Sequence, residues 1–141
     1  MIRVDRFMPS DLETIRVQAA QPELAADRMT LALAYAGAGS AFTARVGGQI
    51  VMCGGAFASH AGHATMWSAL AEDAGPAMLA LTRATRRLID KLNYPRLDTY
   101  VRPTHAPAVR WVKLLGFVEE ARLSRWFDDG EDVMIFSRVA R

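Results

Sequence analysis

The chain has 141 residues, of which 51% are hydrophobic and 23% charged, and its formal net charge is +2. This composition excludes disordered and fibrous proteins. The length suits one hydrophobic core, so we expect a single domain over residues 1–141. A net charge this close to zero gives no strong signal for a nucleic-acid partner. The longest apolar stretch, residues 31–42, is too short to span a membrane.

The amino-terminal residues and the rare residue types narrow the chemistry further. Charged residues occupy the positions where a signal peptide has its apolar region, which predicts a cytoplasmic protein. Cys53 is the only cysteine, so it has no partner for an internal disulfide. It lies in an apolar run, where a free thiol packs as a small hydrophobic group more often than it reacts. His60 and His63 have no further metal-ligating residue at a suitable spacing, and we expect no metal site.

Strand patterns recur along the whole chain. Gly47–Gly48 separates two of them at the two-residue spacing of a β-hairpin. Gly54–Gly55, within the second arm of that hairpin, predicts a bulge. The segments with strand-like alternation or apolar character are residues 2–7, 41–46, 49–57, 64–70, 96–101, 117–127 and 133–139.

Helix signals lie between these strands. Ser10 and Glu13 have the spacing of a capping box, which predicts that a helix begins there. Pro22 and Pro76 suit the first turn of a helix, and Gly116 suits the residue that ends one. We expect a first helix that begins at Ser10, and three more helices at residues 22–35, 76–92 and 108–115.

The order of these elements predicts an α/β (α+β) fold. The helix at 76–92 connects the strand at 64–70 to the strand at 96–101, and a crossover of this length makes those two strands parallel. Short turns join most of the other strands, which are therefore antiparallel. We expect a mixed, mostly antiparallel sheet of about six to seven strands with helices on both faces.

The carboxyl-terminal half carries a resemblance to a known family. In His105–Glu120, the positions of Ala108, Leu115, Gly116 and Phe117 match the short helix and following strand of the GNAT superfamily of acetyl-CoA-dependent N-acetyltransferases. The element order of the whole chain resembles that family as well. The resemblance implies the GNAT fold and, if the protein is active, acyl transfer from acetyl-CoA to an amine.

The cofactor turn departs from the family pattern. The resemblance implies an Arg/Gln-x-x-Gly-x-Gly/Ala turn whose N–H groups hold the pyrophosphate, because glycine allows close approach and a helix start favours anions. Here Glu72 and Asp73 are acidic, and Pro76 has no N–H group. The acids are expected to cap the helix more than to act as a base. If acetyl-CoA binds, the expected backbone contacts are those of Ala69, Leu70, Ala71, Gly75, Ala77 and Met78.

The catalytic acid of the family is also missing. Many members have a tyrosine four residues before the glycine that ends the short helix, and this chain has Val112 there. His105 stands where the family often has asparagine. It is the one candidate for a catalytic acid or base, and helix capping is the alternative role.

A narrower resemblance offers a reason for these losses. Trp67, Arg86–Ile89, Tyr100–Val101 and Arg110–Gly116 are similar to segments of small GNAT-like proteins of tailed bacteriophages, including internal virion proteins. This resemblance implies a phage-encoded protein with a degenerate active site, located in the host cytoplasm or the virion and acting through protein contacts. Trp126–Phe127 is the expected contact with a protein partner or in a homodimer.

Two further hypotheses remain open at the level of sequence. The first is an active N-acetyltransferase with an atypical cofactor turn, since much of this chemistry is the positioning of an amine against a thioester. The second is a nucleic-acid-binding module that uses Arg83, Arg86, Arg87 and Arg96. A solvated helix face is the favoured explanation of these arginines, because the total charge is nearly balanced.

Overall fold

The computed structural model describes residues 2–17, 34, 36–37 and 40–140 of the chain. Its helices are α1 (Pro9–Thr14), α3 (Met78–Leu92) and α4 (Ala106–Leu114), and a single 3₁₀ turn, Gly75–Ala77, precedes α3. The expected helix at 22–35 lies, except for residue 34, outside the described residues. The strands are β1 (Ile2–Arg6), β2 (Ala41–Val46), β3 (Gln49–His60), β4 (His63–Leu70), β5 (Arg96–Val101), β6 (Val118–Leu123) and β7 (Val133–Val139).

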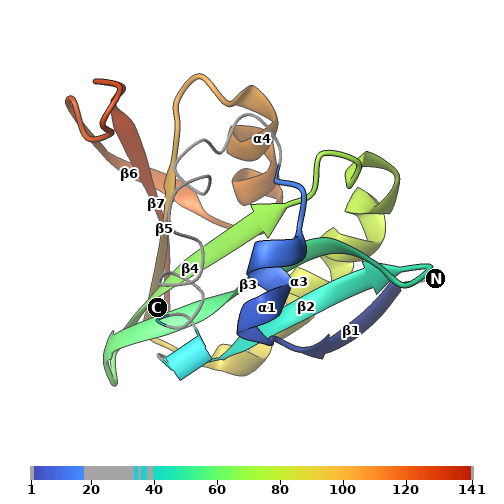
Figure 1. Cartoon of the computed structure of the whole chain (residues 1–141). Coiled ribbons are helices and arrows are strands. Elements are labelled where there is room, and N and C mark those ends of the chain that lie inside the picture. Colours follow the sequence, from blue (N-terminus) through green and yellow to red (C-terminus); the bar gives the residue numbers. More distant parts are fainter. Residues whose placement is uncertain (1, 18–33, 35, 38–39, 141) are drawn as a thin grey trace.

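The strands form one seven-stranded sheet in the order β1-β2-β3-β4-β5-β7-β6. Neighbouring strands are antiparallel except for β4 and β5, which are parallel. Figure 1 shows β1 at one edge of this sheet and the β6–β7 hairpin at the other. The expected mixed, mostly antiparallel sheet is confirmed, together with its one parallel pair around the crossover helix α3.

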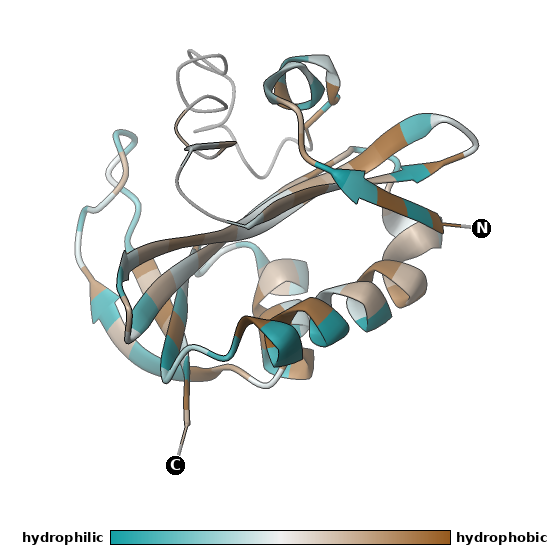
Figure 2. Cartoon of the chain, turned by 90° about the horizontal axis from the view of Figure 1, so that it is seen from below, coloured by the Kyte–Doolittle hydropathy of each residue, from teal (hydrophilic) through white to brown (hydrophobic). Residues whose placement is uncertain are grey.

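Helices lie on both faces of the sheet, as the sequence predicts. Figure 2 shows α1 on one face and α3 and α4 on the other. The buried residues of α3 are Leu81, Thr85 and Ile89, which recur every four residues and so form one stripe against the sheet. The largest fully buried side chains come from both halves of the chain and include Phe136, Leu12, Met52, Leu81 and Val133.

The start of α1 differs from the prediction. The helix begins at Pro9, so Ser10 lies inside it and is not its cap. Proline has no N–H group and suits the first helical position, which moves the cap to Met8. The Met8 N–H donates to the Asp11 carboxylate at 2.9 Å, so Asp11 and not Glu13 closes the first turn.

The expected bulge at Gly54–Gly55 is wrong, because both glycines pair in register with β2. The register shift of this hairpin lies next to Ala44 and Arg45 instead. Gly55 has another role. A Cβ atom there would lie 2.1 Å from the Ser40 carbonyl oxygen. Only glycine therefore lets the chain before β2 approach β3 this closely.

Strand β6 ends at Leu123, four residues before the expected end at Phe127. Arg125 has a φ of 52°, which an extended strand does not allow. Residues 124–132 form a loop whose Asp129 and Glu131 carboxylates accept from Arg102, the residue after β5, and these long-range contacts favour the loop over a longer strand.

Candidate functional site

A gap between β4 and β5 divides the sheet near its middle. The two strands pair from His63–Arg96 to Thr65–Asp98 and then separate. At the point of separation, the Thr99 hydroxyl donates to the Met66 carbonyl at 3.2 Å. A cavity of about 270 Å³ opens there.

Residues from both faces of the sheet line the cavity. On the face of α3 and α4 these include Thr85, Ile89 and Trp111, and on the opposite face Phe57 and Trp67. Most of the lining is aliphatic or aromatic, and its hydroxyl groups belong to Thr65, Ser68, Thr85, Thr99 and Tyr100. A mainly apolar wall with a few polar groups is typical of small-molecule sites.

Arg102, the residue after β5, holds the β6–β7 loop against the cavity. Its guanidinium donates to Asp129 at 2.9 Å and to Glu131 at 2.6 Å, and it lies 3.8 Å from the ring centre of Phe127. Arg102 is only 9% exposed, so its charge is compensated mainly by these two carboxylates. We call Arg102 with Asp129 and Glu131 the clamp. Arg102 and Phe127 both line the cavity, so the clamp fixes part of the cavity wall.

The two carboxylates of this clamp are held in their charged form. Backbone hydrogen bonding from Glu131, and then the Arg102 guanidinium, lower the pKa of Asp129 below its usual value. The pKa of Glu131 is lowered first by its hydrogen bond from the Thr104 hydroxyl and then by Arg102. Above the ordinary carboxyl pKa, both acids are ionised and the clamp is intact.

The neighbouring loop residue Trp126 is 51% exposed and stacks on exposed Tyr100, with ring centres 5.7 Å apart. The sequence predicted that Trp126 and Phe127 together form a contact with a protein partner or in a homodimer. The structure separates them, since Phe127 faces Arg102 and the cavity while Trp126 faces solvent.

A buried polar cluster lies where β4 and β5 still pair. The Asp98 side chain is 6% exposed and accepts hydrogen bonds from the Thr65 hydroxyl at 2.7 Å and from the His63 ring at 2.8 Å. Arg96 lies 3.5 Å from the same carboxylate and also pairs with Glu120. Asp98 therefore fixes the Thr65 hydroxyl at the cavity wall.

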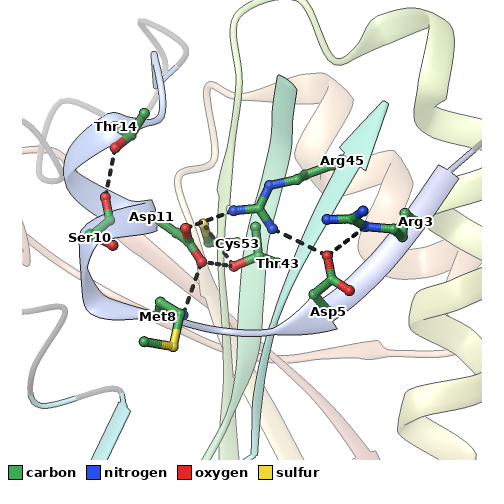
Figure 3. A network of polar contacts seen from close by, with 9 residues as sticks. All are labelled: Arg3, Asp5, Met8, Ser10, Asp11, Thr14, Thr43, Arg45 and Cys53. Atoms are coloured by element: carbon green, nitrogen blue, oxygen red, sulfur yellow. Dashed lines mark hydrogen bonds and ion pairs between the residues drawn. The ribbon is translucent and has the colours of Figure 1, made fainter. Parts of the chain in front are cut away.

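Figure 3 shows a second polar network, which joins α1 to β2. Asp11 is buried and accepts from the Thr43 hydroxyl at 2.7 Å and from Arg45 at 2.9 Å. Arg45 also contacts Asp5 of β1. Cys53 lies 3.9 Å from the Thr43 hydroxyl, and its burial raises the thiol pKa to about 12. The thiol is thus protonated and buried, in agreement with the prediction that Cys53 is a packing residue.

His105 lies at the amino-terminal cap of α4 and lines the cavity. Its side chain makes no capping hydrogen bond to the helix, so the expected capping role is not seen. Val112 also lines the cavity, at the position where the resemblance implies a tyrosine. An alkyl side chain has no proton to donate, so this wall offers no acid at that position.

Most N–H groups of the turn from β4 into α3 already donate to backbone carbonyls. Pro76 has none, and five others donate to backbone carbonyls: Ala71 to Val51, Glu72 to Arg16, Ala74 to Ala71, Ala77 to Ala74 and Met78 to Gly75. Glu72 and Asp73 are exposed on this turn, and Glu72 lies 3.4 Å from Arg16. A pyrophosphate needs several outward N–H groups and no adjacent acids, so the turn does not fit that group.

Only one of the six residues proposed to offer backbone groups to acetyl-CoA lines the cavity, namely Leu70. Ala69 pairs with Cys53 inside the sheet, and Ala71 forms a bridge with Val17. Gly75, Ala77 and Met78 belong to the 3₁₀ turn and the start of α3. Their contact with a cofactor remains a prediction.

Four residues of the site were missed by the sequence reasoning: Thr65, Thr85, Asp98 and Arg102. Asp98 and Tyr100 alternate along the predicted strand at 96–101 and Arg102 follows it directly, so two opposite charges at alternate positions of a buried segment were a usable signal. Within the described residues, no group of histidine, cysteine or acidic side chains is arranged to hold a metal ion. The described helices are all too short or too polar to cross a membrane.

Solved structures share this fold over nearly the whole chain. Ard1 from Thermoplasma volcanium matches with a TM-score of 0.80 and 22% identity, over 99% of this chain and 98% of that one. The ribosomal-protein-S18-alanine N-acetyltransferase from Escherichia coli matches with a TM-score of 0.75 and 21% identity, over 99% and 94% of the two chains.

An acetyltransferase of the GNAT family from Bacillus anthracis matches with a TM-score of 0.69 and 13% identity, over 98% of this chain and 94% of that one. No protein-family model matches the sequence, and no curated protein does. At these identities the likeness concerns the fold. The chain has the fold of GNAT acetyltransferases.

Proposed function

We propose that this protein has a GNAT fold that is degenerate at the acetyl-CoA site, and that it acts through protein contacts as a virion-associated or accessory protein. The observation that carries this proposal is the β4–α3 turn. Five of its N–H groups already donate to backbone carbonyls, and Glu72 and Asp73 lie beside the place where a pyrophosphate would rest.

The loss of donors outweighs the effect of the acids. A hydrogen bond to a charged group contributes about 1.5–3 kcal/mol. Two unit charges about 4 Å apart in water interact by ~1 kcal/mol, and salt screens this further. Removing the two acids alone would therefore not restore a phosphate site. The turn would also have to expose N–H groups that now close it.

Calorimetric titration with acetyl-CoA tests the proposal, with thermal unfolding as a second readout. A ligand at one hundred times its Kd stabilises a protein by about 2.7 kcal/mol, so binding would be visible as a rise in Tm. We expect no heat of binding and no rise in Tm at millimolar acetyl-CoA. Micromolar binding would refute a degenerate site.

The partner role is a further part of the proposal. The exposed stack of Trp126 on Tyr100 supports it, because large exposed aromatic side chains are frequent at protein contacts. If the protein is a homodimer, light scattering would give twice the mass of one chain. The variant Trp126→Ala would then have the mass of a single chain. A monomer at all concentrations would leave only a contact with a different protein.

The phage-encoded origin, and the location in the host cytoplasm or virion, rest on the resemblance of the carboxyl-terminal half to bacteriophage proteins. Mass spectrometry of purified particles of the encoding phage tests the virion location directly. The presence of the chain in particles supports it, and its presence in infected cells alone contradicts it.

A second candidate function is an active N-acetyltransferase, and the cavity favours it. Residues from both faces of the sheet line it, so it could hold a donor and an acceptor amine side by side, and His105 lies at its wall. A panel of amines, including a peptide with the amino-terminal alanine that the E. coli protein's name implies, tests this through release of free thiol from acetyl-CoA. Turnover that His105→Ala abolishes would establish the second candidate over the first.

A further inference from the structure

Exposed cationic side chains gather on the outer side of α3 and α4. The buried residues of each helix face the sheet, so its exposed residues point to solvent. We call the exposed cations of these two helices the basic face, and they are Arg83, Arg86, Arg87, Lys91, Arg110 and Lys113.

The two helices present these cations as one surface. Both helices lie on the same face of the sheet (Figure 2). The Trp111 indole of α4 donates to the Thr82 hydroxyl of α3 at 2.8 Å, so the helices are in direct contact. Arg110 directly precedes Trp111, and Arg86 follows Thr82 by one helical turn. Cations from both helices therefore flank this contact.

No carboxylate neutralises the basic face. Within the described residues, none of its six side chains forms an ion pair. Asp90, the one acid of α3, pairs with Arg138 at 3.1 Å instead. Arg45, Arg96 and Arg102 differ, because each lies within ion-pair distance of two carboxylates. A mixed, solvated helix face would show such pairs, and this face does not.

The small net charge of the chain conceals a separation of charge. Outside the basic face the chain has 11 basic and 15 acidic residues, so the remainder is net negative while the face is strongly positive. On α3, Arg87 lies four residues from both Arg83 and Lys91. Like charges at this spacing repel and destabilise a helix. An anionic partner would remove this repulsion.

The residue types of the face favour the phosphates of a nucleic acid. Four of the six cations are arginines, whose planar guanidinium can donate two parallel hydrogen bonds to one phosphate. Leu79 and Leu114 are the only large hydrophobic residues exposed on the two helices, whereas a helix that binds a membrane surface has a continuous apolar face. Neither helix exposes an aromatic side chain on which the bases of a single strand could stack. The basic face therefore suits the backbone of a duplex.

We propose that the basic face binds the phosphate backbone of a nucleic-acid duplex without reading its bases. The inference goes beyond the proposed function and does not depend on the state of the acetyl-CoA site. Three of the four arginines that the sequence suggested for such a module belong to this face. The fourth, Arg96, pairs with Asp98 and Glu120, and Arg110 and Lys113 of α4 take its place.

Fluorescence anisotropy with a labelled DNA duplex of about 20 base pairs, measured over a range of salt concentrations, tests this. Each phosphate contact releases counterions, so six contacts would give a slope of about −5 in a plot of log affinity against log salt concentration. Two duplexes of unrelated sequence should bind within about threefold of each other, since phosphate contacts carry no sequence information. The absence of binding at low salt, or a slope near zero, would overturn the inference.

A pair of matched double variants locates the contact. Arg83→Gln/Arg87→Gln should weaken binding and make the salt slope shallower by about 2, because two phosphate contacts are lost. Arg6→Gln/Arg122→Gln is the control, since it removes two exposed arginines of β1 and β6 that also lack an ion pair within the described residues. It changes the net charge equally and should leave the slope unchanged. Equal losses in both variants would mean attraction by the net charge alone and would overturn the inference. Binding to phosphatidylserine vesicles without binding to the duplex would assign the face to a membrane and would overturn it as well.

Discussion

Replacing Thr85 by valine should stabilise the free protein, which is an unusual outcome for a core substitution. The hydroxyl is buried without a partner, and such a group costs about 1–3 kcal/mol. Valine has nearly the same shape, and its helix propensity is close to that of threonine. We expect a gain of about 1 kcal/mol or more in the free energy of unfolding, or a rise of ~3 °C in Tm for a chain of this size.

The matched control is Thr82→Val on the same helix. Its hydroxyl accepts from the Trp111 indole and donates to the Met78 carbonyl, so the substitution leaves the Trp111 N–H without its acceptor and should destabilise by about 1–3 kcal/mol. Urea unfolding of both variants, followed by tryptophan fluorescence, gives the two free energies. If Thr85→Val destabilises as much as Thr82→Val, the Thr85 hydroxyl has a partner and the reasoning about an unmet hydrogen bond is refuted.

The remaining predictions concern the loop, the hairpin and the amino-terminal network. The pKa values of Asp129 and Glu131 are lowered in the folded protein, so their contribution to stability is present above the unfolded carboxyl pKa and is lost as pH falls through the folded value. The double variant Asp129→Asn/Glu131→Gln should therefore show a smaller loss of Tm between neutral and acidic pH, and an unchanged loss would contradict this. Gly55→Ala should cost about 1–3 kcal/mol or more by overpacking, since the new Cβ would lie 2.1 Å from a backbone carbonyl. Gly54→Ala is its control and should cost less, because the nearest atom, at 2.9 Å, is the flexible end of a methionine; equal losses in urea unfolding would count against the close approach. Asp11→Ala should cost about 3–5 kcal/mol, because it leaves Arg45 and its neighbours without their buried carboxylate, and a loss below ~1 kcal/mol would show that the network is solvated.

Local sequence patterns predicted the elements of the sheet well because strand and helix periodicities depend on near neighbours. The strand at Arg96–Val101 and the strand at Val133–Val139 were predicted with their observed ends. The crossover helix and the parallel pair also follow from local signals, since a helix between two strands of one sheet leaves little choice of topology.

Two of the incorrect expectations depend on distant contacts. The predicted strand to Phe127 stops early because Arg102, at the end of β5, binds the acids of the loop. The expected bulge at Gly54–Gly55 is absent because the glycines serve a close approach of residue 40, which lies far from them in sequence. Neither contact leaves a periodic signal.

The sequence by itself determined the order of elements, the absence of a tyrosine at position 112 and the two acids in the turn after β4. Only the tertiary structure decided which side chains and backbone groups contact one another. It placed the Asp98 carboxylate next to Thr65, left the Thr85 hydroxyl unpaired at a cavity and engaged five N–H groups of residues 71–78 with backbone carbonyls. Hydrogen-bond satisfaction and cavity shape arise from residues brought together by folding, and so only the folded chain reveals them.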